Sequence, residues 1–150
     1  MENEKISVKT CGKLYIAGEY SVLKCGNSAI IKNVDIFMRA RINFSKTSEY
    51  HIFSDMFDYS ATLEYDKNYL LIQSTIKNVN DFLILNGIDP EAIDLEITGK
   101  MEKNGKKYGI GSSGSVVVLV IKAMFELYCK KSGGNFFQKR QFLNWQLIRC

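Results

Sequence analysis

The stretch Tyr108-Gly109-Ile110-Gly111-Ser112-Ser113-Gly114-Ser115 leads directly into an apolar segment, Val116–Tyr128. This pattern predicts a glycine- and serine-rich loop followed by a long buried helix from about Ser112 to Cys129. Glycine lets the backbone turn successive N–H groups toward one point, and the helix adds its own free N–H groups and the positive end of its dipole. We therefore expect the loop to bind phosphate. Three nearby lysines would raise the positive potential there: Lys103, Lys106 and Lys107.

The same glycines also fit other patterns, which their surroundings exclude or disfavour. The plain alternative is that serine and glycine simply begin a buried helix beside a solvated lysine-rich loop. A P-loop is excluded because the sequence holds no G-x-x-x-x-G-K-[ST]. Gly109, Gly111 and Gly114 match the dinucleotide fingerprint, but a lysine-rich segment stands where that motif requires a buried strand. The protein-kinase loop pattern also matches, yet the 28 residues after Lys122 are too few for the catalytic segments of that class.

The order of apolar patterns predicts one α+β unit over residues 1–129 and an attached tail over residues 130–150. Strict alternation from Ile36 to Phe44 indicates a half-buried strand. A helix is expected from Leu70 to Leu83, where apolar residues recur at helical spacing until Gly87. Further short strands are predicted at Ile6–Val8 and Leu14–Ala17, around a turn at residues 10–13, and at 29–31, 49–53, 60–64 and 93–97.

The composition is that of a folded globular protein, with 46% hydrophobic and 24% charged residues and a single proline. The four cysteines lie far apart and His51 is the one histidine, so neither a zinc site nor a disulfide framework is expected. The longest apolar run, Val116–Ile121, is too short to span a membrane, and the N-terminus does not resemble a secretory signal. A cytoplasmic protein without membrane contact is predicted.

The basic charge is concentrated at one end of the chain. Residues 129–150 carry a net charge of +5, which leaves the first 128 residues at −1. A nucleic-acid-binding domain spreads its positive charge over the fold, so binding to nucleic acid is not expected of the body of the protein. RNA binding by the tail is an alternative, because lysine and arginine residues of the tail alternate with aromatic residues that could stack on RNA bases: Phe136, Phe137, Phe142 and Trp145.

Two segments taken together resemble the GHMP small-molecule kinases. Lys9-Thr10-Cys11-Gly12-Lys13-Leu14-Tyr15-Ile16-Ala17-Gly18-Glu19-Tyr20 is similar to the first motif of that family, and Tyr108–Val118 is similar to the second, its phosphate loop. The residues of both motifs, together with Ser54–Asp58, resemble those of the bacterial family members that act on 5-phosphomevalonate. The resemblance covers residues 5 to about 128 and implies an α+β, ribosomal S5 domain 2-like fold, the N-terminal ATP-binding domain of a GHMP kinase.

The resemblance also implies a reaction and roles for individual residues. Phosphoryl transfer from ATP·Mg²⁺ to 5-phosphomevalonate would give 5-diphosphomevalonate and ADP, a step of the mevalonate route to isoprenoids. Lys13 would be the catalytic residue, near the acceptor and the γ-phosphate, and with Tyr20 it would bind the substrate. Ser113 would ligate Mg²⁺, and Glu19 would contact that serine or the metal. The nucleotide would lie against Lys106, Gly109, Gly111, Ser112, Ser113, Gly114 and Ser115.

The sequence departs from the family pattern in two ways. Mevalonate kinases tend to have A-P-G-K and G-E-H where this chain has Thr10–Lys13 and Gly18–Tyr20, which disfavours mevalonate itself as the acceptor. The catalytic aspartate and the C-terminal glycine-rich motif of the family do not occur in the 150 residues. We therefore expect the chain to be a truncated kinase that is inactive alone, with a missing C-terminal domain or fragment as its partner. An inactive nucleotide-binding remnant is a further alternative.

Overall fold

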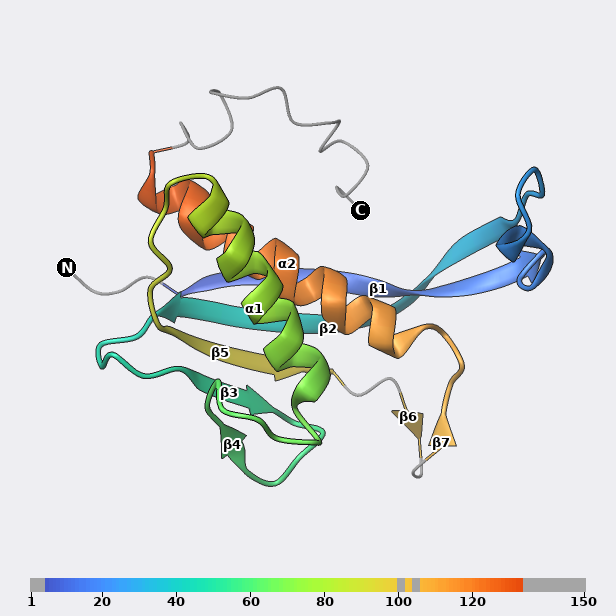
Figure 1. Cartoon of the computed structure of the whole chain (residues 1–150). Helices are drawn as coiled ribbons and strands as arrows, with labels where there is room; N and C mark the ends of the chain where they lie inside the picture. The colour runs from blue at the N-terminus through green and yellow to red at the C-terminus, as the bar shows by residue number, and fades with distance from the viewer. Residues whose placement is uncertain (1–4, 100–101, 104–105, 134–150) are drawn as a thin grey trace.

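Two long strands form one side of a five-stranded sheet in the computed structural model, which describes residues 5–99, 102–103 and 106–133 (Figure 1). The strand order is β1-β2-β5-β3-β4. β3 and β5 run parallel, and the other neighbours are antiparallel. The strands are β1 (Ile6–Ala17), β2 (Ile30–Phe44), β3 (His51–Ser54), β4 (Ser60–Ala61) and β5 (Ile93–Thr98).

Two helices cover the same face of this sheet (Figure 1). α1 (Leu70–Leu85) connects the β3–β4 pair to β5, and α2 (Ser112–Lys131) packs against β1, β2 and α1. The predicted end of the first helix is confirmed at Gly87, whose φ of 76° is a conformation that favours glycine after a helix. By length and composition α2 could cross a membrane, but in this fold it is a core helix, whose own residues Leu119, Val120 and Ala123 are fully buried.

The alternating pattern of β2 places its apolar residues under the helices. Met38, Ala40 and Ile42 are fully buried, while Arg39 and Arg41 are exposed on the opposite face. The neighbouring strand repeats the pattern, with Ile93, Leu95 and Ile97 buried. Full burial of each large aliphatic side chain stabilises the fold by about 1.5–3 kcal/mol, and these rows together form the floor of the core.

The predicted turn at residues 10–13 is wrong, because β1 runs through it without a break. The register shifts between Cys11 and Gly12, where β2 carries the extra residues Asp35 and Ile36, and the pairing of β1 with β2 continues on both sides of the shift. The glycine that suggested a turn is thus a strand residue paired with Val34. β2 likewise begins at Ile30 and joins the predicted strand at 29–31 to the one from Ile36.

The outer halves of β1 and β2 form a two-stranded arm that extends beyond the helices (Figure 1). At its tip the chain turns through a short 3-10 helix, η1 (Ser21–Leu23). The arm exposes several large apolar side chains: Leu14, Ile16, Tyr20, Val22, Leu23, Ile30 and Ile31.

The lysine-rich segment before the glycine loop contains a second, two-stranded sheet. β6 (Glu102–Lys103) pairs with β7 (Lys106–Lys107), where the sequence predicted only a loop. The predicted tail at 130–150 lies outside the described residues from residue 134 onward, so the suggestion that it is a separate basic segment stays a prediction.

Candidate phosphate-binding site

The loop before α2 has the backbone shape that the sequence predicted. Gly109 and Gly111 have φ of 68° and 73°, in the left-handed region that favours glycine. Gly111 is the N-cap of α2, and the helix has no side-chain cap. The N–H groups of Ser112, Ser113 and Gly114 precede the first helical bond, which runs from the Ser115 N–H to the Gly111 carbonyl, so they can bind an anion.

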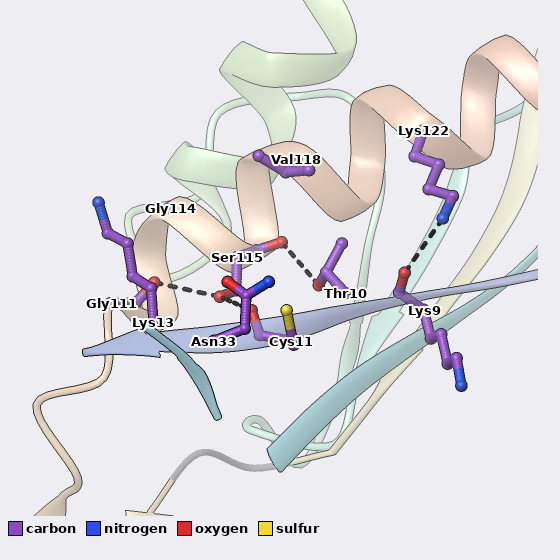
Figure 2. Close-up of a pocket in the computed structure, with 10 residues that line it drawn as sticks. All are labelled: Lys9, Thr10, Cys11, Lys13, Asn33, Gly111, Gly114, Ser115, Val118 and Lys122. Atoms are coloured by element: carbon purple, nitrogen blue, oxygen red, sulfur yellow. Dashed lines mark hydrogen bonds between the residues drawn. The ribbon is translucent and has the colours of Figure 1, made fainter. Parts of the chain in front are cut away.

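Strand β1 holds this loop through both main-chain and side-chain bonds. The Lys13 N–H donates to the Ile110 carbonyl, with 2.8 Å between nitrogen and oxygen. The Ser115 hydroxyl donates to the Cys11 carbonyl at 3.0 Å, with the Gly111 carbonyl also within 3.2 Å (Figure 2). The Thr10 hydroxyl donates to the Ser115 carbonyl at 3.2 Å. The two segments that resemble family motifs are therefore bonded to each other although about a hundred residues separate them.

Gly12 allows the close approach on which these bonds depend. A Cβ atom at Gly12 would lie 2.7 Å from Ile110 Cδ1 and 2.9 Å from Val34 Cγ2. Both distances are shorter than van der Waals contact, so any larger residue would push the loop away from β1.

The Lys13 side chain lies across the loop at Gly111. A Cβ atom built on Gly111 would come within 3.0 Å of Lys13 Cγ and 3.1 Å of its Cε. The Lys13 ammonium is exposed, 3.5 Å from the Tyr15 hydroxyl and 5.0 Å from the centre of that ring. This arrangement places one exposed positive charge near the uncapped start of a helix, two features that both favour a phosphate.

A cavity of about 320 Å³ lies between β1 and the first turns of α2, next to the loop (Figure 2). At one end it is lined by Lys13, Gly111 and Gly114, and at the other by Val118 and Lys122. Sequence reasoning did not find Asn33, Val118 or Lys122. No local pattern marks them, since they line the cavity only because β1, β2 and α2 are adjacent in the fold.

The predicted loop residues differ in how accessible they are to a ligand. Ser113 and Gly114 are exposed and Ser112 is half-buried, which leaves them accessible to a ligand. Ser115 is only 7% exposed, and both its N–H and its hydroxyl bond to protein carbonyls. Lys106 lies in β7, and its side chain is outside the described part of the structure.

Tyr20 and Glu19 lie in the arm rather than at the loop. Tyr20 is 81% exposed, and Glu19 is exposed beside it. β1 continues from Lys13 to Ala17 before reaching them, about 13 Å of extended strand. The structure describes no contact between Glu19 and Ser113, the two side chains predicted to serve a metal. Within the described residues, no group of three or more His, Cys, Asp or Glu could hold a metal ion.

Comparison with known proteins gives this site a family context. No protein-family model matches the chain. It is similar to a Streptococcus pneumoniae phosphomevalonate kinase solved in complex with phosphomevalonate and AMPPNP, with 54% identity, a TM-score of 0.78, and coverage of 82% of this chain and 37% of that one. The phosphomevalonate kinase of Streptomyces sp. strain CL190 is 26% identical over 133 residues, which cover 75% of this chain and 36% of that protein. A Methanococcus jannaschii mevalonate kinase, 20% identical with a TM-score of 0.71, shares the fold.

A glycine loop before an uncapped helix is bonded here to a lysine-bearing strand of an α+β sheet, and this fold matches the N-terminal domain of GHMP kinases. The chain is similar to the N-terminal part of phosphomevalonate kinases. The predicted fold class is thereby confirmed. The chain spans little more than a third of the length of these relatives.

Proposed function

We propose that the chain takes part in the ATP-dependent phosphorylation of 5-phosphomevalonate to 5-diphosphomevalonate, with release of ADP. The observation that carries the proposal is the glycine loop held against Lys13 by the bond between the Lys13 N–H and the Ile110 carbonyl. The proposal is supported by 54% identity to the Streptococcus pneumoniae enzyme solved with phosphomevalonate and AMPPNP.

Phosphoryl transfer depends mainly on positioning the reactants and stabilising charge, and it needs little covalent chemistry from the protein. An oxygen of the acceptor phosphate attacks the γ-phosphorus, and the bond from that phosphorus to the oxygen that leaves with ADP breaks. The free N–H groups of Ser112–Gly114 and the start of α2 would hold the nucleotide phosphates. Lys13 would neutralise charge that develops on the transferred group. We propose that Lys106 and Tyr20 contact nucleotide and acceptor respectively, as the family resemblance implies.

Mg²⁺ is expected to accompany ATP, but the two side chains predicted to serve it do not form a metal site in this structure. Ser113 is exposed at the loop, whereas Glu19 lies in the arm. A single hydroxyl is a weak ligand for a hard cation that prefers several oxygens. The proposed location is the cytoplasm, as for an enzyme of small-molecule metabolism.

The binding experiment is a calorimetric titration of the 150-residue chain with AMPPNP in the presence and absence of Mg²⁺. Gly111→Val should abolish binding, because a β-branched side chain is strained at a φ of 73° and its Cβ would meet Lys13. Gly87→Val is the matched control: its φ of 76° imposes similar strain, but it lies at the end of α1 in open space.

Binding that survives Gly111→Val would make the loop a plain helix start and sink the proposal. Circular dichroism of both variants separates lost binding from lost folding. If the chain binds AMPPNP but no diphosphomevalonate forms when ATP, Mg²⁺ and 5-phosphomevalonate are supplied, the chain alone holds nucleotide without transferring phosphate. We expect this result, because the chain spans only 37% of the enzyme it resembles.

A further inference from the structure

We propose that Thr10 and Ser115 are positioning residues whose hydroxyls form a latch between β1 and α2. The latch consists of these two side chains and the carbonyls of Cys11 and Ser115 that they bond. It fixes the glycine loop against β1 and thereby sets where Lys13 lies relative to the phosphates. The consequence for nucleotide binding rests on the proposed function, whereas the geometry can be measured without a ligand.

The two hydroxyl bonds of the latch cross in opposite directions. The Thr10 hydroxyl, on the strand, donates to a helix carbonyl, and the Ser115 hydroxyl, on the helix, donates to a strand carbonyl. Ser115 is buried, so its hydroxyl needs a protein partner, and leaving a buried polar group unpaired is costly. A reciprocal pair of this kind fixes the distance between α2 and β1 and prevents α2 from sliding along the strand.

The latch stands next to a register shift in the pairing of β1 with β2, where β2 carries the extra residues Asp35 and Ile36 opposite the Cys11–Gly12 step. Beyond this step β1 continues to Lys13, which bonds the Ile110 carbonyl through its N–H and crosses Gly111 with its side chain. Residues 10–13 are thus consecutive in β1, and each contacts the loop or the first turn of α2. A shift at the latch must displace Lys13 from the loop.

The remaining anchors of α2 lie further along the helix. Val116, Leu119 and Val120 are buried in the core and do not depend on either hydroxyl. Losing the latch should therefore loosen the first turn and the loop while the rest of the sheet and helix stays folded. Local opening of this kind is seen as faster exchange of particular amide hydrogens.

The test is amide hydrogen exchange by NMR on the full 150-residue chain. Thr10→Val and Ser115→Ala remove one hydroxyl each, and the Lys13 amide should exchange at least tenfold faster in both. Thr10→Ser keeps the hydroxyl and should restore slow exchange. Thr75→Val is the matched control, since it removes a buried hydroxyl that donates to the Leu71 carbonyl at 2.7 Å within α1. That control should leave the Lys13 amide unchanged.

AMPPNP affinity of the same variants gives the functional half of the test. Thr10→Val and Ser115→Ala should weaken binding at least fivefold, and Thr10→Ser should not. The inference is overturned if the exchange rate of the Lys13 amide is unchanged in both variants. It is also overturned if the Ala40 and Ile42 amides of the central sheet accelerate by the same factor as the Lys13 amide. Normal affinity in a variant whose Lys13 amide opens would overturn it too. If the parent chain binds no AMPPNP while the exchange results hold, the proposed function fails and the latch stands.

Discussion

At the scale of single residues, Gly12 decides how close the loop can come to β1. Gly12→Ala should lower the free energy of unfolding by about 1–3 kcal/mol, the usual cost of overpacking a tight contact. The clash is with Ile110 Cδ1 at 2.7 Å and Val34 Cγ2 at 2.9 Å. Urea unfolding of the variant measures the loss.

A second variant identifies the cause of that loss. Ile110→Val removes the Cδ1 atom, so the double variant with Gly12→Ala should recover part of the stability. A double-mutant cycle would then show a favourable coupling between the two changes. Strictly additive losses would mean that the glycine is needed for its backbone and not for the contact with Ile110.

At the scale of elements, the hydroxyls of the buried Tyr128 and the half-buried Tyr50 join the helices to the segments around them. The Tyr128 hydroxyl, on α2, accepts a bond from the Glu91 N–H at 2.8 Å, just before β5. The Tyr50 hydroxyl, beside β3, accepts one from the Asn80 amide of α1 at 3.0 Å. Burial raises the pKa of both phenols above the ordinary value of 10.0.

These raised pKa values predict a loss of stability at alkaline pH. Above pH 10 the unfolded chain releases phenol protons that the folded chain still holds, so unfolding becomes more favourable as pH rises through the folded pKa. Below pH 10 both the folded and the unfolded chain keep these protons, so the two phenols add no pH dependence to the free energy of unfolding. Urea midpoints at pH 8, 10 and 11 measure how steeply the stability falls with pH.

Tyr128→Phe should make this fall less steep, and the lost hydrogen bond should lower the free energy of unfolding by about 1 kcal/mol. An unchanged dependence of stability on pH would contradict the assignment to Tyr128.

Periodicity predicted the elements that have one buried face and failed where no face is buried. The inner half of β2 alternates strictly because its apolar side lies under two helices. In the arm, the sequence predicts short strands at Leu14–Ala17 and 29–31, but residues 32–35 of β2 have no buried face and no alternation, so the full length of that strand is not predicted. A glycine can mark either a turn or an irregular place in a strand, and at Gly12 it marks a step in β1 where the register with β2 shifts.

At the scale of the whole molecule, the site joins a locally encoded part to a part set by the fold. The glycine loop was predicted from its own residues, since glycine and a following helix suffice to describe it. The place of Lys13 came only from the resemblance to a family, because no local pattern connects it to Gly111. The bonds from the Thr10 hydroxyl to the Ser115 carbonyl and from the Ser115 hydroxyl to the Cys11 carbonyl could not be predicted at all, because they depend on how α2 lies along β1.

The most direct test of the central claim, that the loop and Lys13 form one phosphate-binding site, is an NMR titration of the ¹⁵N-labelled 150-residue chain with AMPPNP. The largest amide shift changes should fall at Gly109–Gly114 and at Lys13, while the amides of β5 (Ile93–Thr98) stay in place. Saturable changes at both the loop and Lys13, separated by about a hundred residues of sequence, would support a single site. Shift changes confined to other parts of the chain, or none at millimolar AMPPNP, would contradict it.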